Sequence, residues 1–569
     1  MIGIVAASAL ALLAACSLTG ASPLIDRVTA AASPTALNPS ITTPVADMAK
    51  KNDKAKKKAK KPKNKKGKKN KGKKANGKKH KKKNKKPKPS TSPPPTPQPT
   101  VTPTPTSGVP AGPGSDPVSP PAGARALWVN PTSGDDDATG AEAAPLRTIA
   151  EAWRRIPRDT TLTQPVWVML RAGVYPESNT PHYWEERRGT LTAPIVLAAA
   201  DGARTAVLRG DINAFQVSHL TLYGLAIDRA GDTFHCEQCS YVTLNGVRLD
   251  GRGDAHETVK VNQSDHITII NSSISGADEN AIDFVAVQHS AIQNNTISDA
   301  GDWCAYVKGG SAYALVSGNR IHHCGTGGFT AGQGTGFEFM VPPWLGYETY
   351  GVTVVNNIIH DTEGAGLGVN GGYNTVMAHN TMYRVGSRSH VVEFVHGSRS
   401  CDGDTAGCRE HRALGGWGGA GIDGQFIPSR HTYFLNNVVL NPPGYESRWQ
   451  HFQLSDPVSP PTGSGVPAPS RVDDDLVIKG NVISNGGAGM ATGLSDSWER
   501  SVLANNRINT MVPDLVDPAG GDFRPRAGGT LAGLPAVGLP DMTWSDVGVP
   551  AGTAPALPAN HPPGALRVP

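Results

Sequence analysis

Ten short segments decide the fold of this chain, beginning with LTLYGLAI (220–227), VTLNGVRL (242–249), ITIINSSI (267–274) and SAIQNNTI (290–297). The unit recurs as ALVSGNRI (314–321), VTVVNNII (352–359), NTVMAHNTM (374–382), YFLNNVV (433–439), LVIKGNVI (476–483) and LANNRI (503–508). Aliphatic residues alternate with other residues in each unit, which ends in an aliphatic residue. Most of these closing aliphatics are 22 to 25 residues apart, and three longer steps of 38, 57 and 44 residues leave room for inserted loops.

This period is typical of one coil of a β-solenoid, in which three short strands are joined by turns. A βαβ unit takes roughly 30 or more residues, a propeller blade takes about 40–45, and a leucine-rich repeat would hold more Leu. One register, two residues before the closing aliphatic, is occupied by Asn295, Asn319, Asn357, Asn380, Asn437, Asn481 and Asn506. Each Asn can hydrogen-bond its copy in the next coil. We therefore predict an all-β solenoid over residues 126–512.

A short amphipathic helix is predicted just before the repeats. Ile149, Ala152, Trp153 and Ile156 recur at i, i+3, i+4 and i+7. The open end of a solenoid offers unpaired strand edges, and a helix laid across it covers them. We expect this helix to cap the N-terminal end.

The body resembles the right-handed parallel β-helix superfamily, and specifically its carbohydrate-active members, over roughly residues 126–530. Its opening, WVNPTSGDDDATGAEAAPLRTIAEAW (128–153), is similar to the leader of secreted β-helix polysaccharide lyases. DPAGGDFRPRAGG (517–529) is similar to the usual exit of such domains. The resemblance implies a right-handed, pectate-lyase-like parallel β-helix, followed here by a Gly/Pro-rich tail over 513–569.

Residues 1–16 are predicted to be a targeting segment. The apolar stretch Ile2–Ala15 is shorter than the ~20 residues that span a bilayer as a helix. It ends in Leu13-Ala14-Ala15-Cys16, which resembles the lipobox of bacterial lipoproteins, and Cys16 would then carry the lipid. The stretch has no Lys or Arg, unlike the usual pattern, and the alternative is an ordinary cleaved signal. Either way we expect export, as a bacterial cell-surface lipoprotein or a secreted protein.

Residues 17–125 are predicted to be a disordered linker. Its Lys-rich part (50–88) holds 24 lysines and one acidic residue. The rest of the chain has 31 basic and 47 acidic residues, a net charge of −16, whereas the whole chain has a net charge of +7. The Pro/Thr-rich part (89–122) favours an extended stalk. The lysines are either a solvated spacer or an anchor to an anionic cell-wall polymer, a nucleic acid or a membrane surface. No specific nucleic-acid site is predicted.

The cysteines indicate an oxidising compartment, because six remain after Cys16 is set aside. Cys401 and Cys408 flank a polar loop and are predicted to form a disulfide. Cys236 and Cys239 are either a tight disulfide or half of a zinc site, and the absence of a second CxxC argues against zinc. The pairing of Cys236, Cys239, Cys304 and Cys324 stays open.

Two Gly-rich loops (324–350 and 384–431) combine aromatic with polar residues, which suits sugar rings. We expect them to form walls of a glycan-binding groove, with Trp344, Tyr347, Arg388 and His390 as substrate contacts. The alternative is that these residues only pack the loops on the solenoid.

Carboxylates gather on neighbouring coils beside lysines. Asp278, Glu279 and Asp283 follow the turn at Gly276, and the coil before them carries Asp254, His256, Glu257 and Lys260. Counting back from the next closing aliphatic places Lys260 and Asp283 at −14 and Lys308 at −13, so the three should lie close together. One interpretation is an ion ladder. The other is calcium-assisted β-elimination on a uronic-acid polymer, in which the cation neutralises the uronate carboxylate and a lysine removes the C5 proton.

This arrangement resembles polysaccharide lyase family nine. The resemblance implies calcium ligands at Asp278, Glu279, Asp283 and Glu257 and a base at Lys308. We expect Lys260 and His256, beside them, to contact the substrate. Two departures are that the family's paired aspartates appear here as Asp-Glu and that the spacing after them is one residue longer. The stretch Asp254-Ala-His256-Glu257 also resembles the Asp-Pro-His-Glu motif of mannuronan C5-epimerases, without its proline.

The sequence as a whole predicts an exported β-helix that acts on an acidic polysaccharide, by calcium-assisted β-elimination. A non-catalytic carbohydrate-binding or adhesive β-helix and a uronan C5-epimerase are the alternatives. Hydrolysis ranks lower, because the motifs of the galacturonan hydrolases of this fold are not intact in this chain. The polysaccharide, its linkage and the oligomeric state are not predicted.

Overall fold

The computed structural model describes residues 117–419, 424–544, 546 and 549–565. The predicted signal segment with Cys16, the Lys-rich tract and nearly all of the Pro/Thr-rich stalk lie outside these residues and stay predictions. Across the described ranges, no helix is long and apolar enough to cross a membrane.

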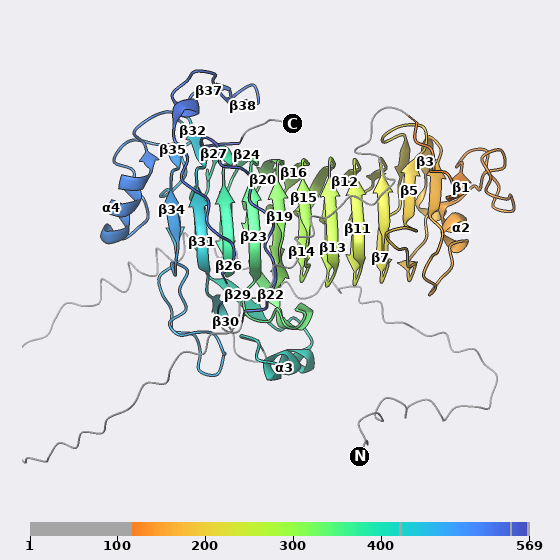
Figure 1. Ribbon diagram of the computed structural model, residues 1–569, viewed down its shortest axis with the longest axis horizontal. Coiled ribbons are helices and arrows are strands. Elements are labelled where there is room, and N and C mark those ends of the chain that lie inside the picture. The colour runs from red at the N-terminus through yellow and green to blue at the C-terminus, as the bar shows by residue number, and fades with distance from the viewer. Residues whose placement is uncertain (1–116, 420–423, 545, 547–548, 566–569) are drawn as a thin grey trace, which may run out of the picture. The chain divides into compact units, whose positions relative to one another are not determined.

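The body consists of three rows of parallel strands (Figure 1). The first row comprises β1 (Arg125–Val129), β2 (Val166–Leu170), β5 (Ile195–Ala199), β8 (Leu220–Tyr223), β11 (Ser240–Asn245), β13 (Asp265–Ile270), β15 (Ala291–Gln293), β19 (Leu315–Ser317), β23 (Thr349–Val355), β26 (Gly372–Ala378), β31 (Arg430–Leu435) and β34 (Val477–Lys479), with β18 (Ser311–Ala312) also paired to β23.

The second row follows the first along the chain. It comprises β3 (Gly173–Tyr175), β6 (Ala206–Leu208), β9 (Ala226–Asp228), the starts of β12 (Arg248–Asn262) and β14 (Ser273–Val285), β16 (Thr296–Ala300), β20 (Arg320–Cys324), β24 (Ile358–Thr362), β27 (Thr381–Val385), β32 (Val438–Asn441), β35 (Val482–Asn485) and β36 (Arg507–Ile508).

The third row completes each coil. It comprises β4 (Trp184–Glu185), β7 (Ile212–Phe215), β10 (Phe234–Glu237), the ends of β12 and β14, β17 (Trp303–Lys308), β21 (Gly327–Ala331), β25 (Ala365–Asn370), β28 (Val392–Val395) and β33 (Phe452–Leu454). Because parallel crossovers are right-handed, the fold is a right-handed parallel β-helix, as the sequence predicts.

The closing aliphatics of the repeats form one continuous inner column. Its members pair in register along the second row: Ile227, Leu249, Ile274, Ile297, Ile321, Ile359, Met382, Val439, Ile483 and Ile508. All of them belong to the main hydrophobic core. A single coil has no core of its own, so this column is what joins the coils into one folded unit.

The Asn register forms a hydrogen-bonded ladder inside the turn between the first and second rows. Along it, each Nδ2 donates to the Oδ1 of the next Asn, from Asn295 to Asn506, at 2.8–3.1 Å. Asn380 shows the full pattern: its Nδ2 also donates to the carbonyl of Val354, and its Oδ1 also accepts the backbone N–H of Asn357. The ladder satisfies polar backbone groups that the turn buries.

Asn380→Ala is expected to lower the free energy of unfolding by about 3 kcal/mol, because it leaves a buried N–H and a buried carbonyl without partners. Asn505→Ala, at an exposed site, is the control and should change stability by less than about 1 kcal/mol. Chemical denaturation measures both. Similar small losses in the two variants would mean that the ladder does not stabilise the fold.

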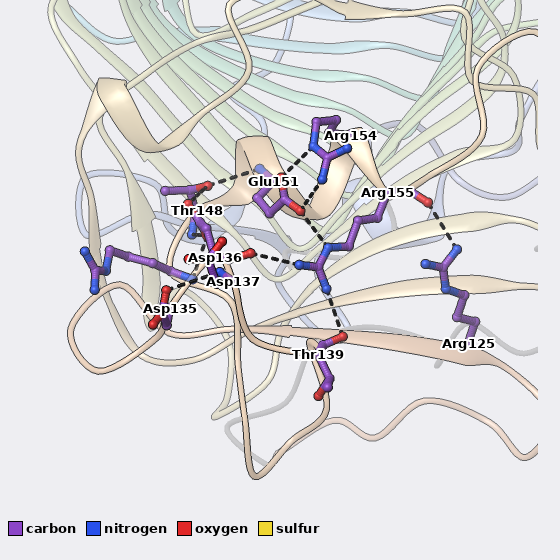
Figure 2. Close-up of polar contacts among 10 residues, drawn as sticks. Arg125, Asp135, Asp136, Asp137, Thr139, Thr148, Glu151, Arg154 and Arg155 are labelled. Atoms are coloured by element: carbon purple, nitrogen blue, oxygen red, sulfur yellow. Dashed lines mark hydrogen bonds and ion pairs between the residues drawn. The ribbon is translucent and has the colours of Figure 1, made fainter.

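Helices cover the two ends of the solenoid (Figure 1). The predicted N-terminal cap is α2 (Ile149–Arg154), which buries Ile149, Ala152 and Trp153. Figure 2 shows what fixes it: Thr148 Oγ1 accepts the backbone N–H of Glu151, and Glu151 pairs with Arg154 and Arg155. At the other end α4 (Asp496–Asn505) packs Val502 on the core.

The last predicted repeat, LANNRI (503–508), is wrong in its first half. Residues up to Asn505 belong to α4, and only Arg507–Ile508 form a strand, β36. Since the described residues after β36 form no further coil that could pair with a strand of the first row, a helix covers this end instead.

The two Gly-rich loops, predicted to be the walls of a glycan-binding groove, come together in an insert module. It contains η2 (Phe337–Phe339), α3 (Thr405–Ala413) and a small sheet of β22 (Gly334–Gly336), β29 (Gly397–Ser400) and β30 (Gly424–Ile427). Figure 1 shows β22, β29, β30 and α3 below the strand rows. A fully buried ion pair between Arg399 and Glu348 and the predicted disulfide Cys401–Cys408 hold the module together. Cys236–Cys239 and Cys304–Cys324 are the other two disulfides.

The C-terminal region packs against the body. The hairpin β37 (Leu515–Asp517) and β38 (Asp522–Pro525) and the turn η3 (Leu531–Gly533) lead into a segment without regular structure. The backbone N–H of Val537 donates to Asn436 Oδ1 at 2.8 Å, and that of Asp546 donates to the Tyr373 hydroxyl at 3.1 Å. The described part of the tail therefore covers the outer side of the first row.

Candidate functional site

The outer surface of the third row carries a column of polar side chains. Six residues are in register on β7, β10, β12, β14, β17 and β21: Asn213, His235, Lys260, Asp283, Tyr306 and Thr330. The residues on either side of Lys260 and Asp283 in the chain, Val259, Val261, Ile282 and Phe284, lie in the core. Since side chains alternate along a strand, this column faces away from the core. The predicted pairing of Lys260 with Asp283 is confirmed.

Five residues of β12 and β14 form an alternating chain of charges, here called the charged cluster: Glu279, His256, Glu257, Lys260 and Asp283. His256 lies between two carboxylates, with Nδ1 at 2.6 Å from Glu257 Oε2 and Nε2 at 3.2 Å from Glu279 Oε1. Lys260 Nζ is 3.0 Å from Glu257 Oε1 and 3.3 Å from Asp283 Oδ2. The side chains of Glu257 and Asp283 are 4% and 2% exposed, whereas that of His256 is 62% exposed.

The electrostatics of the charged cluster favour the charged forms of His256, Lys260, Glu257 and Glu279. Hydrogen bonds to Glu257 and Glu279 raise the pKa of His256 to about 10, so its ring is positively charged at neutral pH. Burial lowers the pKa of Lys260, but the charges of Asp283 and Glu257 outweigh burial and the net direction is upward. Burial likewise raises the pKa of Glu257, but the contacts with His256 and Lys260 outweigh it and lower that pKa. Two cations thus balance two of three carboxylates.

The raised pKa of His256 predicts a pH-dependent contribution to stability. The unfolded imidazole has a pKa of about 6.5, so the stabilisation is complete below that pH and is lost as the pH rises through about 10. We expect the difference in Tm between wild type and His256→Gln to be largest near pH 6 and to shrink steadily toward pH 10. Thermal melting in a pH series measures it, and a constant difference would show that the imidazolium is not the stabilising form.

Tyr306 and Lys308 extend the site onto the next coil. Lys308 pairs with Val285, not with Asp283, so it stands two residues beyond Tyr306 and on the same outer side. Its Nζ donates to Gln333 Oε1 at 3.1 Å and lies 4.4 Å from the centre of the Tyr306 ring. Tyr306 is buried, which raises the pKa of its phenol far above the usual value, and its hydroxyl accepts from Asn280 Nδ2 at 3.3 Å.

The carboxylates that the resemblance implies as calcium ligands do not converge on one point. The gap between Glu257 and Asp283 holds the Lys260 ammonium, and the gap between Glu257 and Glu279 holds the His256 ring. Asp278 is exposed. One buried oxygen, Asp283 Oδ1, has no hydrogen-bond partner among the described residues, but calcium takes 6–8 oxygen ligands. The residues as placed do not fit a calcium ion.

The predicted aromatic contacts lie away from the charged cluster. Trp344 and Tyr347 pack with Tyr350, Tyr373 and Trp417 in a separate aromatic cluster beside the first row. Tyr347 is 8% exposed, so little of its ring is open to a sugar. These two residues hold the insert module on the solenoid.

Arg388 and His390 lie further along the solenoid. Arg388 is exposed and pairs with Glu363 at 2.8 Å. His390 is buried, and its Nε2 is 2.7 Å from Gln450 Oε1. Neither has a contact with the charged cluster among the interactions of the described residues.

Several residues at the site were not predicted from the sequence. Tyr306 and Asn280 connect the coils of the charged cluster and Lys308. Gln333 and Phe339 come from the insert module: Gln333 holds Lys308, and the carbonyl of Phe339 accepts from Gln263 Nε2 at 3.2 Å. The Phe339 side chain is 44% exposed beside the third row. Only Tyr306 had a sequence signal, since it lies two residues before Lys308 on the same strand.

Comparison with known proteins agrees with the fold. A family model described as a right-handed beta helix region matches residues 232–399. No curated protein matches the sequence.

Three solved structures are similar in architecture. A rhamnogalacturonan lyase is 12% identical with a TM-score of 0.42, over 69% of this chain and 95% of its own. The pectate lyase Pel9A is 15% identical with a TM-score of 0.38, over 79% and 98%. The A-module of the Azotobacter vinelandii mannuronan C-5 epimerase AlgE4 is 14% identical with a TM-score of 0.34, over 64% and 100%. At these identities and scores the likeness concerns the fold, and no activity is inferred from it.

Proposed function

We propose that this protein binds an acidic polysaccharide on the outer surface of its third row and cleaves it by β-elimination at a uronate. The observation that carries the proposal is the gathering of three cationic side chains, His256, Lys260 and Lys308, on one outer face of adjoining coils. The charged cluster as a whole holds three carboxylates against two cations, so the attraction for a polyanion is local, at the exposed His256 ring and at Lys308, which has no carboxylate partner among the described residues. A polymer of negatively charged sugars is the substrate class that we propose for these two positions.

The reaction requires a base and a counter-charge. The C5 proton of a uronate is weakly acidic, because its carboxylate resists further negative charge. The His256 ring is exposed and positively charged. Both of its nitrogens bond to Glu257 and Glu279, so it would favour proton removal through its charge beside that carboxylate rather than through a hydrogen bond. A base then takes the C5 proton, a double bond forms between C4 and C5, and the C4–O bond breaks. The departing oxygen takes the bonding electron pair and a proton from water, which releases the next sugar.

Lys308 is the proposed base. It is the lysine of the outer face that is not held between carboxylates in the described structure, since its Nζ bonds to the neutral Gln333. The C5 proton would pass to its amine nitrogen. Gln333 and the Tyr306 ring position that amine over the column that contains Asp283.

A non-catalytic glycan-binding protein is the second candidate. The observation that favours it is that His256 and Lys260 already have carboxylate partners at 2.6–3.3 Å, which is also what an ion ladder requires. A C5-epimerase would share the proton removal but would return a proton to C5 without breaking the chain.

Incubation with a panel of polyuronates and neutral glycans separates these functions. Elimination gives an unsaturated sugar end with ultraviolet absorbance, from a polyuronate and not from a neutral glycan. Epimerisation gives exchange of the C5 proton with solvent and no shortening. Binding with neither product would reject the enzyme assignment.

A further inference from the structure

The most buried part of the charged cluster is the contact of Lys260 with two carboxylates of different coils. Glu257 precedes Lys260 by three residues on β12, and Asp283 stands in register beside Lys260 on β14. Two carboxylates this buried cannot both stay ionised without a counter-charge close by. The Lys260 ammonium provides it at 3.0 and 3.3 Å.

We propose that Lys260 is a built-in cation that takes the place of a divalent metal ion between Glu257 and Asp283 and keeps such an ion out. The side chain cannot diffuse away as a metal ion does, because its backbone is fixed by the register of β12 between β10 and β14. A calcium ion bound to the same oxygens would lie 2.3–2.6 Å from each. It would then meet both the bulk and the positive charge of the ammonium.

The His256 ring lies in the adjoining gap, 2.6 Å from Glu257 and 3.2 Å from Glu279. His256, Glu257 and Glu279 offer three ligand atoms close together, so the exclusion of the metal is proposed only for the oxygens of Glu257 and Asp283 that bind Lys260. If the proposed function holds, the reaction should need no calcium. The exclusion of the metal itself does not depend on the proposed function.

The test uses thermal melting of the full chain without substrate, with calcium or with a chelator. We expect the Tm of the wild type to be the same with calcium as with the chelator. Lys260→Ala leaves Asp283 without a counter-charge and Glu257 with His256 alone, and it should lower Tm by roughly 5 °C. Calcium should restore part of that loss, because an ion that binds only the folded state stabilises it by mass action.

Lys308→Ala is the matched control, because it removes an ammonium from the same outer face but from a neutral partner. Its Tm should not respond to calcium. Lys260→Gln, which keeps most of the side-chain volume, is the second variant should Lys260→Ala not fold, and it should show the same calcium response. A calcium-induced rise in Tm as large in the wild type as in the Lys260 variants, or none in either, would overturn the proposal. The outcome does not depend on whether the protein cleaves any polysaccharide.

Discussion

Lys308→Ala is expected to lower the turnover of an acidic polysaccharide about 100- to 10,000-fold, the usual loss when a general base is removed. Lys308 is half-buried on the outer face, bonded to Gln333 and lying over the Tyr306 ring, and it pairs in register with Val285. It makes no ion pair within the described residues, so its loss leaves no carboxylate without a direct partner. The variant should therefore fold and bind glycan like the wild type. Initial rates of unsaturated product, with a parallel binding measurement, check this.

Lys479→Ala is the control for that experiment. Lys479 is an exposed lysine at the end of β34, in the first row and away from the charged cluster. Removing it changes the net charge by the same amount but should leave turnover unchanged. Equal losses in both variants would mean that general charge, rather than a base at Lys308, supports the activity.

Ile297→Asp is expected to abolish cooperative folding of the body. Ile297 is fully buried on β16 and stacks between Ile274 and Ile321 of the neighbouring coils. The change combines the loss of a large buried side chain, about 2–5 kcal/mol, with burial of an unpaired carboxylate, which costs about 3–5 kcal/mol more. Domains are typically stable by about 5–15 kcal/mol in total. Because stacked coils share one core, the damage should spread beyond one repeat.

Thr296→Asp provides the comparison for the core substitution. It introduces the same carboxylate one residue earlier, at a half-buried position whose side chain points away from the core. Its cost should be near 1 kcal/mol or less. Circular dichroism melts of both variants measure the contrast, and a cooperative, near-native melt of Ile297→Asp would refute the inner column.

The repeats could be predicted from the sequence because both of their markers are periodic. A buried column such as Ile274, Ile297 and Ile321 needs an aliphatic residue in every coil, and the Asn ladder needs a short amide at one fixed turn position. Both requirements recur at the coil period, so they are visible without a structure. The helix α4 breaks this logic, because its last residues also match the repeat pattern in LANNRI (503–508), and the coil period does not show where the repeats end.

The site could be predicted only in part, because the turns between the third row and the first row of the next coil differ in length. Counting residues paired Lys260 with Asp283 correctly but placed Lys308 one residue too close, since Asp283 stands beside Tyr306. No sequence pattern indicates that the side chains of Lys260 and His256 lie between the carboxylates of the charged cluster. That arrangement depends on the distances between side chains, which coil counting does not provide.

The insert module shows a different limit. Trp344 and Tyr347 were expected to face a sugar, yet they pack with Tyr350 and Tyr373 on the first row. An aromatic residue in a Gly-rich loop suits both roles equally, and only the tertiary contacts decide between them. Gln333 and Phe339, which contact residues of the third row, belong to the same module, and no sequence pattern distinguishes them from their neighbours.

The most direct measurement of the central claim is a crystal structure of Lys308→Ala with a bound oligouronate. The account predicts that the sugar chain lies over β12, β14 and β17, with a uronate carboxylate within hydrogen-bond distance of His256 or Lys260 and the C5 carbon facing the space left by the Lys308 amine. An oligouronate bound elsewhere on the solenoid, with the charged cluster untouched, would contradict it.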